Sequence, residues 1–145
     1  MNRIVKQFLI GTTPLWIGML LNAVLNLIPL PIFFVSLAFL IFWTWMCYKC
    51  CVRWESIWQQ AAVLSGFGTL MLIFVLFQEL VLHRYWVSYF GIATQMYFLP
   101  GLGFFAVLIS RILPVTTPWN VYIVELMGLF LCALLGCRLK TRKKA

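Results

Sequence analysis

The feature of this chain that most constrains its fold is a series of long apolar runs that carry almost no charge. At about 1.5 Å per helical residue, four of them can cross the roughly 30 Å hydrocarbon core of a bilayer. Hydrophobic residues make up 64% of the chain and charged residues only 10%, whereas a soluble domain is about half apolar and a quarter charged. The sequence therefore predicts an all-α integral membrane protein with a single membrane domain over residues 1–145. The four predicted transmembrane helices cover about residues 8–28, 32–48, 61–81 and 119–137.

A further apolar segment, over about residues 85–113, is interrupted by the sequence Leu-Pro-Gly-Leu-Gly. Pro100 removes a backbone donor and disfavours a helical conformation at the residue before it. Gly101 and Gly103 permit turns that other residues avoid. Each half of the segment is too short to span a bilayer alone. We therefore expect a broken segment that forms a re-entrant or interfacial hairpin, and the alternative is one kinked span, which makes five transmembrane helices.

The positions of lysine and arginine favour the first of these threadings. With four spans, nine of the eleven cations lie on the side of both termini, and only Arg84 and Arg111 lie on the other side. With five spans, the cations divide five to six. Cytoplasmic segments of membrane proteins carry an excess of lysine and arginine. We therefore expect both termini on the cytoplasmic side of a bacterial inner membrane, with a basic cytoplasmic tail over residues 138–145.

Ionisable side chains inside the apolar segments are the first candidates for chemistry. Glu125 lies six residues into the last run, where a charged group is costly unless it is partnered or functional. Arg111 is the candidate partner because four spans place it on the same side of the membrane. Glu79 lies near the end of the third run, where it can reach the headgroups. Glu125 is therefore expected to form a structural ion pair, to be a protonated carboxyl near the interface, to belong to an ion or proton pathway, or to contact a cation of a partner, whereas Glu79 is expected to be an interfacial cap.

Two patterns predict helix packing. Asn22 and Asn26 are four residues apart and share one face of the first run. Asparagine side chains hydrogen-bond between helices in lipid, and small residues allow helices to approach closely. Gly66 and Gly68 form such a small patch in the third run. Because four thin helices bury few faces internally, we expect a homo-oligomer or a membrane protein partner in the bilayer.

The five cysteines suggest a rival function. Cys47 and Cys50 form a C-x-x-C pair at the end of the second run, and Cys51 follows directly. Cys132 and Cys137 lie near the end of the last run, on the same side when there are four spans. Cys47 and Cys50 are therefore redox candidates, although buried cysteines often serve as small apolar packing residues. A zinc site is not expected, because no second C-x-x-C or histidine pair accompanies the first.

The chain lacks the motifs of the common enzyme classes. It has no nucleophile elbow, no phosphate-binding loop and no aspartate. The cations flank the apolar runs instead of forming a basic face with aromatic residues, which argues against nucleic-acid binding. We therefore predict a non-enzymatic accessory, sensor or immunity-type subunit of a membrane complex, without cofactor or metal. The alternatives are a small transporter or pore that uses Glu125 and Arg111, and a membrane thiol oxidoreductase that uses Cys47 and Cys50.

Overall fold

The computed structural model describes residues 3–52, 56–84, 88–112 and 117–142, and these form helices joined by short links. No strand occurs among them, so the predicted all-helical fold is confirmed. Five helical stretches are long and apolar enough to cross a membrane: α1 with α2, α3, α4 with η1, α5 and α6. The elements are α1 (Arg3–Ile10), α2 (Thr13–Leu25), α3 (Ile32–Cys50), α4 (Ile57–Leu76), the π-helical η1 (Phe77–Val81), α5 (Tyr89–Ile112) and α6 (Pro118–Arg142).

Prolines mark the start of several helices. Pro14 lies in the first turn of α2, Pro31 precedes α3, and Pro118 is the first residue of α6. A proline costs least at these positions, because the first N–H groups of a helix have no partner within the helix. Gly11 separates α1 from α2 and packs against the backbone carbonyl of Leu64 on α4. The first transmembrane stretch is therefore two short helices held against α4 where they meet.

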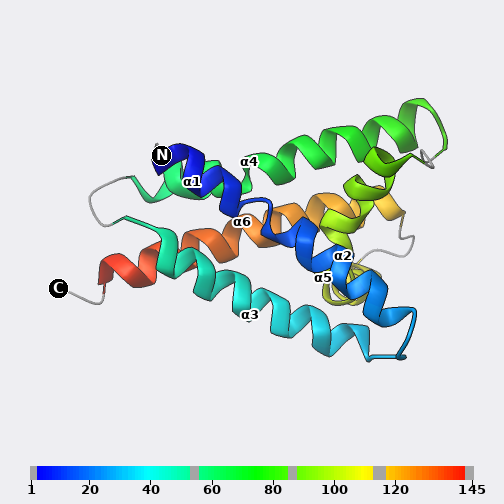
Figure 1. The fold of residues 1–145 in the computed structure, drawn as a ribbon, viewed down its shortest axis with the longest axis horizontal. Coiled ribbons are helices and arrows are strands. Elements are labelled where there is room, and N and C mark those ends of the chain that lie inside the picture. The colour runs from blue at the N-terminus through cyan, green and yellow to red at the C-terminus, as the bar shows by residue number, and fades with distance from the viewer. Residues whose placement is uncertain (1–2, 53–55, 85–87, 113–116, 143–145) are drawn as a thin grey trace.

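The helices α3, α4 and α6 run roughly along one axis, and α5 lies across them (Figure 1). The start of α1 and the end of α6 lie at the same end of the molecule, and α5, yellow-green in the figure, lies in the opposite half. The contacts of α5 agree with this position: they involve the first turn of α3, the last turns of α4 and the first turns of α6. The ring pairs are Phe33–Phe104, Phe74–Phe90 and Phe98–Tyr122, with centroids 5.7, 4.8 and 5.1 Å apart.

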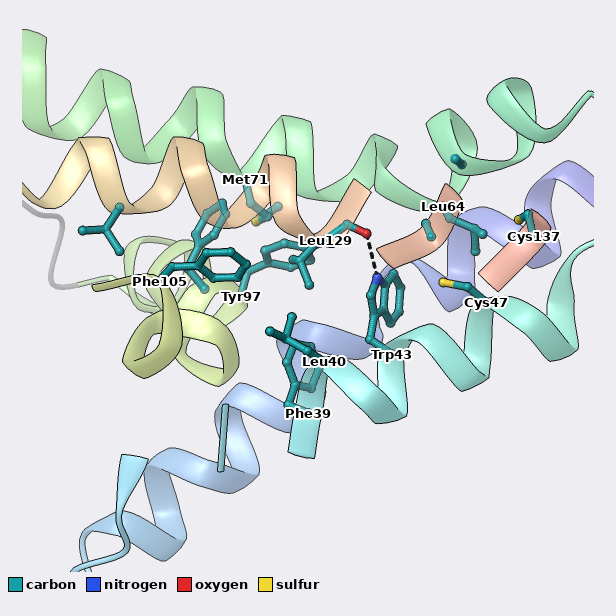
Figure 2. Packing of buried hydrophobic residues seen from close by; sticks show 14 of the residues in the cluster. Phe39, Leu40, Trp43, Cys47, Leu64, Met71, Tyr97, Phe105, Leu129 and Cys137 are labelled. Carbon is teal, nitrogen blue, oxygen red and sulfur yellow. Dashed lines mark hydrogen bonds between the residues drawn. The ribbon is translucent and has the colours of Figure 1, made fainter. Parts of the chain in front are cut away.

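In the half that holds the termini, α1, α3, α4 and α6 pack against one another. Trp43 of α3 is fully buried, and its Nε1 donates to the carbonyl oxygen of Leu129 on α6 at 3.2 Å (Figure 2). Gln7 Nε2 of α1 donates to Gln60 Oε1 of α4 at 3.1 Å. A Cβ on Gly136 would lie 2.6 Å from a carbonyl of α3, so α3 and α6 approach each other closely there. Apolar burial and a few buried hydrogen bonds thus hold this half together.

Two details differ from the expectation. The segment with Pro100 is one continuous helix, α5, and not two halves separated by a turn; residues 85–87 and 113 lie outside the described residues. The first part of the expected basic tail is helical, because α6 continues to Arg142; residues 143–145 are not described. The physical reason for the continuity of α5 lies in the partners of its backbone around Pro100.

Candidate functional site

The helix α5 is held at Pro100 by contacts with three other helices. Proline has no N–H group, so the carbonyl of Met96, four residues earlier, loses its helical donor. Gly18 of α2 packs directly on this carbonyl, and a Cβ at Gly18 would overlap the Met96 oxygen. Only glycine allows this approach, which brings a Cα–H group to the free carbonyl.

The next turn of α5 uses side chains of α6 and α3 as acceptors. The N–H of Gly101 donates to Glu125 Oε1 at 3.1 Å, and the N–H of Gly103 donates to Ser36 Oγ at 3.1 Å. Proline and glycine are tolerated in membrane helices where neighbouring side chains satisfy the freed backbone groups. These partners explain why α5 continues through the sequence that predicts a break. We call this arrangement the Pro100 site, which consists of Pro100, Gly101, Gly103, Gly18, Ser36 and Glu125.

Glu125 is fully buried, with an exposed fraction of 0%. Its carboxyl lies against the backbone of Gly101, where a Cβ would overlap Oε1. Its second oxygen, Oε2, has no hydrogen-bond partner among the described residues. The site therefore offers one free acceptor position in an apolar interior.

A second group of buried polar atoms lies one turn away. The hydroxyls of Tyr97 and Ser65 are buried and have no partner within the described part of the chain. Gly68 brings α4 against Tyr97, because a Cβ at Gly68 would lie 2.5 Å from the Tyr97 hydroxyl oxygen and 2.8 Å from Leu126 Cδ1. Tyr97 precedes Gly101 by four residues and shares its face of α5. Two of the residues singled out in the sequence, Gly68 and Glu125, thus face neighbouring turns of α5.

The expected ion pair between Glu125 and Arg111 is not formed. Arg111 is exposed in the last turn of α5, ten residues after Gly101, which is about 15 Å along the helix axis. The length of α5 between Gly101 and Arg111 therefore keeps the arginine away from the Glu125 carboxyl. Glu79 is half-buried in η1, and its neighbour Gln78 is fully buried.

Several polar residues of the interior were not singled out in the sequence, among them Thr94, Ser36 and Tyr97. Gln78 Nε2 donates to Thr94 Oγ1 at 3.1 Å and so joins η1 to α5. Ser36 and Tyr97 also have buried hydroxyls that face α3–α5 and α4–α5 contacts. In the sequence, these residues could be noticed only as polar side chains within an apolar run. Such side chains often form hydrogen bonds within their own helix, as the Ser110 hydroxyl does by donating to the carbonyl of Val107.

The residues predicted to pack helices divide into two groups. Asn22 and Asn26 are both exposed, the second just beyond the end of α2. At Gly66 a Cβ would meet only the ring of Phe8, at an ordinary distance of 3.7 Å. Of these four residues, Gly68 alone lies at a contact too close for a side chain.

The cysteines gather where α3 and α6 end. Cys51 and Cys137 form a disulfide with a Cα–Cα distance of 5.3 Å, which ties the segment after α3 to α6. Cys47 and Cys50, the predicted redox pair, are free thiols; Cys47 is buried and Cys50 is half-buried. The described residues contain no group of three histidine, cysteine or acidic side chains that could hold a metal ion.

Comparisons with protein families, with curated proteins and with solved structures found no match. The Pro100 site can bind a donor or exchange a proton at Glu125 Oε2, and the cysteine end can take part in thiol–disulfide exchange. The outer face of α2 offers two amides, each of which can both donate and accept.

Proposed function

We propose that this chain is a non-enzymatic polytopic membrane protein that acts through helix–helix contacts, with a second copy of itself as the first partner. The observation that carries the proposal is the exposure of Asn22 on α2 and of Asn26 just beyond the end of this helix. Their neighbours Met19 and Leu20 are apolar and 46% and 64% exposed, as expected for a surface in lipid. An amide in hydrocarbon is costly without a hydrogen-bond partner, so a partner helix at this face would stabilise both.

A second copy supplies such a partner by symmetry. In a two-fold contact between parallel α2 helices, each asparagine lies at the same depth as its equivalent in the other copy. An amide offers two donors and an acceptor, so it pairs with an identical amide. Ala23 is also exposed on α2 and leaves room for close approach. The face is thus suited to contact with itself.

The proposal includes four membrane spans, with the continuous helix α5 lying in one half of the bilayer without crossing it. The start of α1 and the end of α6 lie at one end of the molecule, which supports an even number of crossings, because an odd number would separate them. The contacts of α5 with Ile32 at the start of α3 and with Glu125 near the start of α6 also support it. The positive-inside rule then favours a cytoplasmic location, at the bacterial inner membrane, for the end that holds the start of α1 and the end of α6. Cytoplasmic thiols are kept reduced, so the Cys51–Cys137 bond is expected in the purified, oxidised protein and not in the growing cell.

Energy transfer between donor- and acceptor-labelled copies in liposomes tests the proposal. Each interhelical asparagine bond contributes about 0.6 to 2 kcal/mol. The double variant Asn22→Leu/Asn26→Leu should therefore raise the dissociation constant of the dimer by about tenfold or more. The matched control is Ser110→Leu, because Ser110 is equally exposed and its hydroxyl bonds within its own helix at 2.9 Å. Equal energy transfer in both variants would refute a contact through α2.

A small transporter or pore is the second candidate, and the free Oε2 of Glu125 favours it. A buried carboxyl within an apolar helix bundle is typical of ion and proton pathways, and this one lies against the helical backbone at Gly101. Arg111 has no place in this version, because it lies far along α5. Proton flux into liposomes should vanish in Glu125→Gln if the carboxyl carries the proton, while the fold persists. Unchanged flux would rule this candidate out.

A further inference from the structure

Two grooves flank α6 in the half that holds both termini. The first lies between α3 and α6 and has a volume of about 650 Å³. Its walls include Ile41, Leu135 and Leu139, and Trp45 and Arg142 lie along it. The second lies between α4 and α6, has a volume of about 610 Å³, and is lined by residues of the same kinds. These are Ile57, Trp58, Leu131, Leu134, Leu135 and Arg138.

The grooves share one chemical pattern. Each has apolar walls, one exposed tryptophan and one arginine in the last turns of α6. Leu135 lines both grooves, and Arg142 follows it by seven residues, which is about 10 Å along the helix. Tryptophan and arginine at one end of an apolar surface are typical of the membrane–water boundary. Each groove thus runs from the boundary into the hydrocarbon.

Further cations surround the first groove. Lys49 Nζ lies 5.7 Å from the centre of the Trp45 ring, and Lys140 Nζ donates to the carbonyl of Lys49 at 2.9 Å. The acids of the described residues, Glu79 and Glu125, lie in η1 and at the Pro100 site, away from both grooves. The groove ends are therefore positively charged without a nearby described carboxylate.

We infer that each groove binds an anionic phospholipid, with its phosphate on Arg142 or Arg138 and an acyl chain along Leu135. Arginine binds phosphate oxygens through two parallel hydrogen bonds. A second copy of the chain fits these grooves less well, because a parallel copy would bring its own cationic end against this one. The site is independent of the α2 contact proposed above, and either can fail without the other.

Native mass spectrometry of the purified full chain, exposed to equal amounts of phosphatidylglycerol and phosphatidylcholine, tests the site. The wild type should retain phosphatidylglycerol preferentially. Each cation near an anionic surface strengthens binding by about fivefold, so Arg138→Gln/Arg142→Gln should lower the preference by about fivefold in each groove. Arg111→Gln is the control, because Arg111 is exposed at the end of α5, outside both grooves. Its preference should equal that of the wild type.

A second variant separates the groove from general charge. Leu135 is 53% exposed, so Leu135→Trp should fold and should narrow both grooves without a change in charge. We expect it to lose bound lipid of both kinds. The inference is overturned if the double arginine variant keeps its preference, or if Arg111→Gln loses it equally. It is also overturned if Leu135→Trp retains phosphatidylglycerol, or if it changes the number of protein copies instead of the number of lipids.

Discussion

Replacement of Gly18 by alanine should loosen the contact between α2 and α5, because the added Cβ would overlap the Met96 carbonyl oxygen. That oxygen belongs to the backbone of a packed helix, so the two helices must move apart. Overpacking of this kind costs typically about 1–3 kcal/mol, and a backbone contact lies at the upper end. Alanine regains about 0.5–1 kcal/mol over glycine within a helix. The expected net loss in the free energy of unfolding is about 2 kcal/mol.

Gly66→Ala provides the matched control. Gly66 also lies inside a helix, but its added Cβ would meet only the Phe8 ring at 3.7 Å. It should gain about 0.5–1 kcal/mol from helix propensity and lose nothing to overlap. The two variants should thus differ by about 3 kcal/mol, or roughly 100-fold in the unfolding equilibrium.

Reversible unfolding of the purified protein in mixed micelles, titrated with sodium dodecyl sulfate and followed by circular dichroism, measures this difference. The helical content before the transition shows whether each variant has folded. If Gly18→Ala proves as stable as Gly66→Ala, then α2 does not pack on the free carbonyl of α5. The contact with Gly18 would then not be among the interactions that keep α5 helical through Pro100.

The remaining predictions concern the Pro100 site, the disulfide and the threading. In the same titration, Glu125→Ala should lower the free energy of unfolding by about 1–3 kcal/mol, because the acceptor of the Gly101 N–H disappears. Glu125→Gln keeps an amide oxygen there and should lower it by less. Equal losses would contradict the hydrogen bond between Gly101 and Glu125. A reducing agent should lower the stability of the wild type by about 2–4 kcal/mol and leave Cys51→Ser, which cannot bond Cys137, unchanged; an unaffected wild type would show that this disulfide is not formed. In intact cells, an impermeant maleimide should label Ser88→Cys, while tags on both chain ends should stay protected from added protease until the membrane is opened. Tags that differ in protection would mean that α5 crosses the membrane completely.

The class of fold could be predicted because it depends on composition and length. A chain that is 64% hydrophobic and divided into apolar runs of helical length cannot bury all of its apolar surface in water, so it is expected to fold as helices in lipid. The helix starts were also predictable at Pro31 and Pro118, since proline at these positions acts through its own ring and missing donor. Boundaries at the polar ends were less exact, and α6 extends to Arg142 because its last turns need no apolar side chains.

The Pro100 segment shows the limit of local reasoning. Pro100, Gly101 and Gly103 by themselves favour a break, and that local preference is real. The outcome depends on whether distant side chains can take the place of the lost hydrogen bonds, and Glu125 supplies one of them from 24 residues away.

The sequence by itself determined that this protein has apolar stretches of membrane-spanning length, that these stretches are helical and that the charges lie mostly between them. These properties follow from the chemistry of each segment taken alone. Only the tertiary structure decided which buried groups meet. Glu125 contacts the backbone of Gly101 and not Arg111, and Cys51 joins Cys137 while Cys47 and Cys50 stay free. Such pairings depend on how helices cross and at what height. The crossing of two helices is governed by close contacts such as that of Gly18 with Met96. The spacing of residues along the chain does not show which residues make these contacts.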